Sequence, residues 1–194
     1  MGWLRTLVVL ACCLGVVGCS DDSPGPEPGP SPTGSVSTPS PSSSSSAPEP
    51  APTEPALPGA AKEATERGAR AFIAYYWDLI NYAQVTGDVT ALKRVSGPNC
   101  TRCRAGIDAI ATVYRKGGRL TDPAYGVEEK STTSLSVPGS DVIAFESKTE
   151  ISNQAHRSIA ADGSTETFQA STVLYVVDVL WTGTGWRLDV MERS

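Results

Sequence analysis

The segment from Ser20 to Pro58 limits where a folded domain can form in this chain of 194 residues. It holds 12 of the 15 prolines, a run of serines at 42–46 and almost no large apolar side chain. Such a composition buries too little apolar surface to offset the entropy of ordering the chain, so we expect an extended linker with some polyproline-II character. The folded domain is therefore predicted at residues 60–194, which are enough for one core.

Residues 1–18 have the parts of a secretory signal peptide. Arg5 supplies a positive charge, an apolar stretch follows at residues 7–17, and Gly18 provides a small residue at the cleavage point. A spanning helix needs about 20 apolar residues, so this stretch is too short. An ordinary secretory signal or a retained, uncleaved anchor is the alternative interpretation.

Residues 16–19, Val-Val-Gly-Cys, resemble the lipobox of bacterial lipoproteins. The resemblance implies cleavage before Cys19 and attachment of diacylglycerol to its thiol. Two acyl chains hold a protein stably, whereas one holds only marginally. We therefore expect a protein anchored by lipid to the extracytoplasmic face of a bacterial cell membrane. Residues 19–59 would be the lipidated cysteine and its linker.

The charge of the processed chain argues against nucleic acid and anionic lipid surfaces as partners. Removal of residues 1–18 takes away Arg5 and no acid, which leaves 15 basic and 21 acidic side chains. An acidic chain without basic clusters lacks the electrostatic attraction that such partners require.

Cys100 and Cys103 are the two thiols left once the signal is removed and Cys19 is lipidated. In an oxidising compartment this pair should form a short-range disulfide. A thioredoxin-like redox pair would follow a strand, whereas the segment before Cys100 is predicted to be helical. A zinc site needs four ligands, and His156 is the chain's one histidine. No metal or other cofactor is predicted.

Helical patterns fill the first half of the domain. In the first helix apolar residues cover more than half of the circumference, so we expect it to be largely engulfed. Gly87 is suited to the left-handed conformation that ends a helix, and Asn99 is the expected N-cap of the third helix. The three predicted helices cover residues 61–85, 89–95 and 100–116.

After Gly118 the pattern changes to strands joined by short turns that contain glycine. Consecutive strands with short turns pair antiparallel. The expected fold class is α+β, with N-terminal helices packed on a curved four-stranded antiparallel sheet. The predicted strands cover residues 124–137, 141–157, 165–181 and 186–191.

The strand at 165–181 carries apolar residues on both faces. One face must pack on the helices, which leaves Leu174, Val176 and Leu180 on the other face in need of cover. Helices on both sides would supply that cover. Otherwise we expect these residues to form a partner face, for a homodimer or for another protein of the cell envelope.

Two stretches carry a family resemblance: residues 72–88, which include Phe-Ile-Ala-Tyr-Tyr-Trp and Thr-Gly-Asp, and residues 96–103, Ser-Gly-Pro-Asn-Cys-Thr-Arg-Cys. They are similar to an uncharacterised family of actinobacterial lipoproteins with one domain of unknown function. The order of helices and strands, with Gly-Trp-Arg-Leu at 185–188, also resembles the nuclear transport factor 2-like (SnoaL-like) cone. Such cones host enzymes and non-enzymatic modules alike, so the resemblance implies a fold and leaves the function open.

A non-enzymatic binding or accessory module of the envelope is the function that these features favour. Its ligand would be a small apolar molecule or a protein partner. Aromatic helix stripes also occur as ordinary core, which is the alternative interpretation of the same residues. The side chains expected to line a ligand cavity are Tyr75, Tyr76, Trp77, Tyr82 and Tyr114.

The alternative is a cone-fold enzyme of isomerase or dehydratase type. Asp178 would be the acid, because burial between Val176 and Leu180 would raise its pKa, and His156 would be the base. An outward-facing Asp178 paired with Arg187 or Arg157 is the competing interpretation. Because nothing in the spacing links Asp178 to His156, no catalytic residue is assigned.

Overall fold

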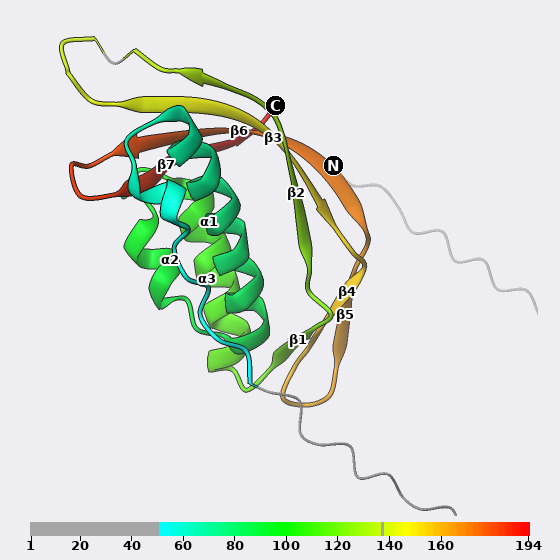
Figure 1. Cartoon of the computed structure of the whole chain (residues 1–194). Coiled ribbons are helices and arrows are strands. Elements are labelled where there is room, and N and C mark those ends of the chain that lie inside the picture. Colours follow the sequence, from blue (N-terminus) through cyan, green and yellow to red (C-terminus); the bar gives the residue numbers. More distant parts are fainter. Residues whose placement is uncertain (1–50, 137) are drawn as a thin grey trace, which may run out of the picture. The chain divides into compact units, whose positions relative to one another are not determined.

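The computed structural model describes residues 51–136 and 138–194, all within one compact unit. The predicted signal peptide, Cys19 and most of the predicted linker lie outside the described residues. The fold is α+β, as expected: helices pack on one face of an antiparallel sheet, and a second, smaller sheet extends from one end (Figure 1). None of the described helices combines the length and the apolar character that crossing a membrane would require.

Helix α1 (Glu66–Thr86) begins five residues later than predicted. A 3-10 turn, η1 (Gly59–Lys62), precedes it, and the Thr65 side chain caps the helix by accepting a hydrogen bond from the N–H of Gly68. Gly68 lets this turn approach closely, because a Cβ there would lie 2.0 Å from the Glu63 carbonyl oxygen. Gly87 ends the helix in the left-handed conformation, with φ of 78°.

Helix α2 (Thr90–Val95) is short, and α3 (Thr101–Arg115) follows the disulfide loop. Cys100 and Cys103 are joined by a disulfide, with 5.2 Å between their Cα atoms. The prediction that Asn99 caps α3 is wrong. Cys100 occupies the cap position, and its Sγ accepts the N–H of Cys103 at 3.2 Å. The disulfide holds this sulfur over the first turn of the helix.

The strands form two antiparallel sheets, and the prediction of one four-stranded sheet is incomplete. The larger sheet has the order β2-β3-β6-β7, and the smaller has the order β1-β4-β5. Their bounds are β1 Arg119–Thr121, β2 Tyr125–Ser134, β3 Ala144–Asn153, β4 His156–Ile159, β5 Thr165–Phe168, β6 Ser171–Trp181 and β7 Trp186–Arg193.

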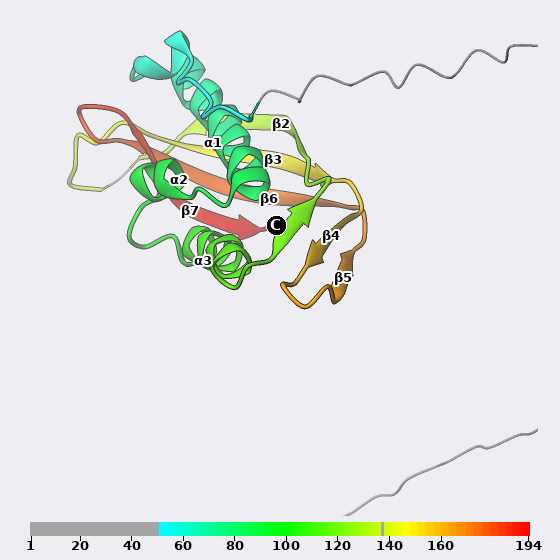
Figure 2. The ribbon, with the colours of Figure 1, turned by 90° about the horizontal axis from the view of Figure 1, so that it is seen from below.

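The second sheet forms because two of the predicted strands are each interrupted, and the two interruptions lie beside each other. The strand expected at 141–157 divides into β3 and β4, and the strand expected at 165–181 divides into β5 and β6. At the break the side chain of Asn153 donates to the carbonyls of Gln154 and Gln169 and accepts from the Ser171 hydroxyl. These bonds bend both strands together, so β4 and β5 leave the larger sheet as an arm (Figure 2).

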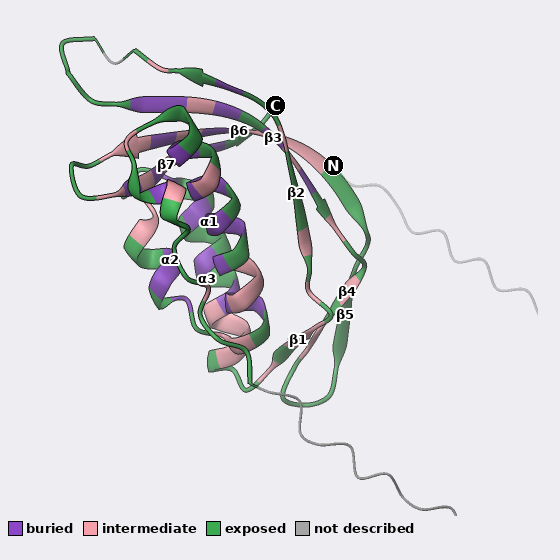
Figure 3. Cartoon of the chain, viewed as in Figure 1, coloured by how far each residue is buried: buried purple, intermediate pink, exposed green. Residues whose placement is uncertain are grey.

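The core lies between α1 and the concave face of the larger sheet. Val177 and Val179 of β6 are fully buried there, as is Leu188 of β7. Figure 3 shows buried residues gathered on α1 and on the strand parts beside it, while the arm is mostly exposed. Among the described residues no helix covers the opposite face of this sheet, so helices on both sides, one of the two alternatives for covering Leu174, Val176 and Leu180, are not observed.

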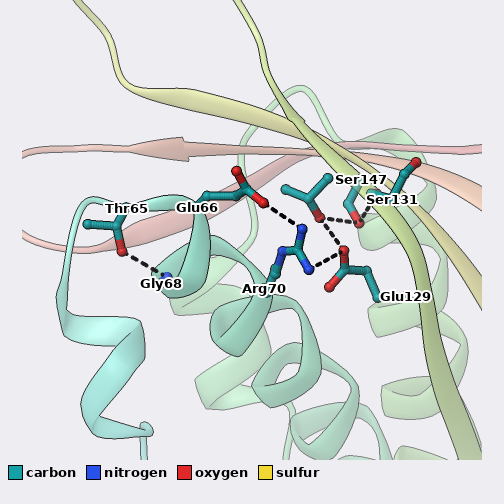
Figure 4. Close-up of polar contacts among 8 residues, drawn as sticks. Thr65, Glu66, Gly68, Arg70, Glu129, Ser131 and Ser147 are labelled. Atoms are coloured by element: carbon teal, nitrogen blue, oxygen red, sulfur yellow. Dashed lines mark hydrogen bonds and ion pairs between the residues drawn. The ribbon is translucent and has the colours of Figure 1, made fainter.

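A polar network ties the start of α1 to the sheet (Figure 4). Arg70 pairs with Glu66 on its own helix and with Glu129 of β2 at 3.2 Å. The Thr132 hydroxyl donates to Glu129 and lies 3.1 Å from the hydroxyl of Ser147, which is fully buried. Because buried polar groups are costly unless they are hydrogen-bonded, this network fixes how α1 sits over β2 and β3.

The described part of the linker also contacts the domain. Glu54 forms an ion pair with Arg94 of α2 at 3.0 Å. Pro52 and Pro55 lie beside Tyr82 of α1 in a shallow surface depression.

Two glycine substitutions test the packing of the helices. Gly68→Ala should lower the free energy of unfolding by about 2 kcal/mol or more, because its Cβ would meet two backbone oxygens. Gly106→Ala in α3 should raise it by about 0.5–1 kcal/mol, because a Cβ there meets no atom within 4 Å and alanine favours a helix. Urea denaturation followed by circular dichroism measures both. Equal effects of the two changes would contradict this packing.

Candidate functional site: a cleft between α3 and the concave sheet

A cleft of about 680 Å³ lies between α1, α3, the concave face of the larger sheet and the arm. Its volume is in the range of small-molecule sites. In Figure 2 the C-terminal end of β7 is seen between α3 and the arm, which flank this region. The helices and the larger sheet line the cleft with Tyr76, Trp77, Gln84, Arg102, Ala105, Gly106, Ala109, Ile110, Val113, Tyr125, Val173, Tyr175 and Arg193. The arm and the strand it pairs with line it with Leu120, His156, Ser158, Glu166 and Phe168.

The inner wall is aromatic. The Trp77 ring lies 5.4 Å from the Tyr125 ring and 6.2 Å from the Tyr175 ring, measured between centroids. Burial, with a smaller contribution from the neighbouring Tyr175, raises the pKa of Tyr125. The phenol of Tyr125 therefore stays protonated at neutral pH and can donate a hydrogen bond.

Two buried donors of this wall have no acceptor among the described residues: Nε1 of Trp77 and Nε2 of Gln84. The two side chains are seven residues apart on α1, so they lie on the same face of the helix. Trp77 is 4% exposed and Gln84 is 3% exposed. Buried donors are normally paired, and an unpaired one costs free energy. Both nitrogen atoms are fully buried, so they lie behind the surface of the cleft and are left unsatisfied by the described part of the chain.

The exposed α3 side of the cleft is built from small residues. Ala105, Gly106 and Ala109 are exposed there, while Ile107, Ile110 and Val113 of the same helix also line the cleft but are less exposed. Larger side chains at the three small positions would fill the space between α3 and the sheet. The small residues therefore keep the cleft open.

The arm supplies the outer wall. His156 of β4 stacks on Phe168 of β5, with 4.9 Å between ring centroids and 15° between planes. These two residues are register partners, as are Ser158 and Glu166. All four line the cleft.

Two arginines that line the cleft lie beside Tyr175. Cζ of Arg102 lies 5.9 Å from the Tyr175 ring centroid, within the range of a cation–π contact. Arg193 of β7 is the register partner of Tyr175, so both side chains project from the same face of the sheet. Both arginines are exposed.

Of the five aromatic residues expected to line a cavity, Tyr76 and Trp77 line the cleft and three lie elsewhere. Tyr75 is 5% exposed within the core, and Tyr82 lies in the shallow depression beside Pro52. The hydroxyl of Tyr114 donates to the carbonyl of Gln84, and its ring packs on Gly87.

The sequence analysis missed Tyr125, Tyr175, Phe168 and the two arginines. The signal for Tyr175 was present, because strand alternation places it on the same face as Val177, a residue of the core. For Arg102 and Arg193 there was no local signal, since they meet only through tertiary structure.

The structure does not bring Asp178 and His156 together. His156 lines the cleft, whereas Asp178 lies opposite Glu146 of β3 on the other face of the larger sheet. Pairing of Asp178 with Arg187 is also not observed. Arg187 instead bonds Asp189 through Nε and Nη2, at 2.6 and 2.7 Å.

Asp178 lies in an environment that disfavours its ionised form. One of its carboxyl oxygens, Oδ1, is buried and has no hydrogen-bond partner among the described residues. Desolvation raises the pKa of Asp178, and the nearby carboxylates of Glu146, Glu192 and Asp189 raise it further. Within residues 51–136 and 138–194 no group of three or more His, Cys, Asp or Glu side chains is arranged to hold a metal ion.

The fold and the cleft define a class: an α+β domain in which helices and a curved antiparallel sheet enclose a ligand-sized space. Residues 39–192 match a family of unknown function, DUF6318, and the chain belongs to that family. No curated protein matches the sequence.

Among solved structures the chain is similar to the intermembrane space region of the chloroplast protein ARC6. The two share 16% identity with a TM-score of 0.50, over 66% of this chain and 95% of that one. At this identity the similarity concerns the fold alone.

The strain at Asp178 predicts a pH-dependent gain in stability from Asp178→Asn. The folded-state pKa of Asp178 is raised, so its contribution to stability is fully present below the unfolded pKa and is lost as pH rises through the folded pKa. Asp178→Asn should therefore stabilise the domain at pH 7, and the gain should shrink towards pH 4. Thermal unfolding of both proteins at the two pH values measures this. A gain that grows as the pH falls would contradict the environment described.

Proposed function

We propose that this protein is a lipid-anchored binding module at the extracytoplasmic face of a bacterial cell membrane, and that its cleft holds a small apolar ligand. The observation that carries the proposal is the cleft itself, with an aromatic wall of Trp77, Tyr125 and Tyr175 and small residues on α3. Pockets that bind small molecules are mostly apolar, with a few placed polar groups. The guanidinium groups of Arg102 and Arg193, which both line the cleft, fit that pattern.

We also propose that the domain is a cone of the nuclear transport factor 2-like type, in which a curved sheet and its helices surround a central space. The bend at Asn153 supports it, because the arm closes one side of the cleft. The lipobox-like Cys19 and the proline-rich linker support an anchor that holds this domain away from the membrane.

We propose that the module is not an enzyme. Asp178 and His156 lie on different faces and cannot act on one substrate as an acid–base pair. The cleft residues described above include donors, guanidinium groups and aromatic rings. These groups suit recognition of a ligand.

A protein partner is the second candidate, and the outer face of the larger sheet favours it. Leu174, Val176 and Leu180 are only half-buried there, next to Val190 of β7. Apolar side chains gathered on an exposed sheet face are a common feature of protein interfaces. A homodimer or an envelope protein could cover them.

A bulky side chain in the cleft tests the ligand proposal. Ala109→Trp should weaken binding of the neutral, apolar dye Nile red at least about tenfold, because the indole would occupy the space that Ala109 leaves open. Dye fluorescence titrated against the protein gives the dissociation constant.

Asp108→Trp is the matched control, because Asp108 is exposed on the same helix and does not line the cleft. Its dissociation constant should stay within about twofold of the parent value. Equal weakening by both changes, or dye binding that Ala109→Trp leaves intact, would show that the ligand binds elsewhere.

A further inference from the structure

We infer that the ligand of the cleft carries an anionic head group, a carboxylate or a phosphate, on an apolar body. This inference rests on the proposed function, and it names the class of molecule that the same cleft takes. The head would bind to the arginine–aromatic cluster, which we define as Arg102, Arg193, Tyr175 and Trp77.

The cluster concentrates hydrogen-bond donors at one place. Arg102 lies over the Tyr175 ring, Arg193 is the register partner of Tyr175, and the Trp77 ring packs against the same tyrosine. The Trp77 N–H is fully buried, so Trp77 contributes its ring to the cluster and the accessible donors are the two guanidinium groups. Guanidinium groups present planar pairs of N–H donors that match carboxylate and phosphate oxygens.

The positive charge of the cluster is not neutralised by the described part of the chain. The ion pairs there involve Arg70, Arg94, Lys130 and Arg187, so Arg102 and Arg193 have no carboxylate within 4.0 Å. Glu166 is the one carboxylate among the described residues of the cleft, and it comes from the arm. Two guanidinium groups beside one apolar cleft contrast with the formal net charge of −5 for the whole chain.

The rest of the cleft suits an apolar body. The small residues of α3 face the space on one side, and Val173, Phe168 and Leu120 line it from the sheets. Because both arginines are exposed, the head group would lie at the mouth, where the cations remain hydrated, while the apolar part is buried. A single-chain amphiphile with a negative head has this distribution of charge and apolar surface.

Four probes built on a saturated chain of twelve carbons, with different heads, test the inference. Dodecanoate, dodecyl phosphate, dodecanol and dodecyltrimethylammonium would be titrated into the full-length protein, with displacement of Nile red as the readout. Each anionic probe should bind about tenfold more tightly than dodecanol, and the cationic probe should bind more weakly than dodecanol. The ratio of dodecanoate to dodecyl phosphate affinity identifies which head the cluster prefers.

The double variant Arg102→Gln/Arg193→Gln should reduce the preference for the anionic probes to within about twofold of dodecanol and leave dodecanol binding unchanged. Arg104→Gln/Arg157→Gln is the control, because it removes the same charge from two exposed arginines outside the cleft. The control should keep the full preference for anions.

Three results would overturn the inference, and they separate it from the proposed function. If the parent protein binds dodecanol as tightly as dodecanoate, the cleft binds apolar molecules but the anionic head is wrong. If the two double variants lose the preference equally, long-range charge and not the cluster is responsible. If none of the probes displaces the dye, or Nile red itself does not bind, the proposed function fails together with the inference.

Discussion

The burial of α1 against the concave face of the larger sheet is the packing constraint on which the rest of the structure depends. Phe72, Tyr76 and Leu79 are 1% exposed, and Ala69 and Ala83 are fully buried. Full burial of one large apolar side chain contributes about 1.5–3 kcal/mol, so this helix supplies much of the core. The network of Arg70, Glu129 and the buried hydroxyls then fixes its direction. Because α1 occupies the centre of the concave face, α3 packs near the β7 edge and the arm, and the cleft lies between them.

The cleft is a consequence of two further local features. The Asn153 side chain bends β3 and β6 into the arm, which provides the outer wall. The disulfide and the cap by Cys100 hold the first turn of α3 in place. Arg102 lies in this turn, directly before Cys103. A structural disulfide thus places one of the two arginines over Tyr175. The same bond that stabilises the fold positions a residue of the proposed site.

Local chemistry explains how much of this could be predicted from the sequence. Three predicted features depend on neighbours in sequence, and the structure confirms them. Apolar residues cover most of the circumference of α1, the helix ends at Gly87, and Cys100 and Cys103 form a disulfide. The later start of α1 and the cap by Cys100 depend on side chains that bond to the backbone only three residues away, but hydrophobic periodicity does not report such bonds. The division into two sheets depends on the bond of Asn153 to the carbonyl of Gln169, which lies between β5 and β6. The site was predicted only in part, at Tyr76 and Trp77. Its other members come from strands and helices that meet in the folded chain.

The central claim is that the ligand binds in the cleft and not on the outer face of the sheet, and the alternation of β6 allows a direct test. Methyl NMR of the protein, titrated with dodecanoate, reports both faces at once, because Val173 lines the cleft while Leu174 and Val176 lie on the outer face. The account predicts chemical-shift changes at Val173, Val113 and Ile110, with Leu174, Val176 and Leu180 unchanged. Changes confined to Leu174, Val176 and Leu180 would contradict it and assign binding to the outer face.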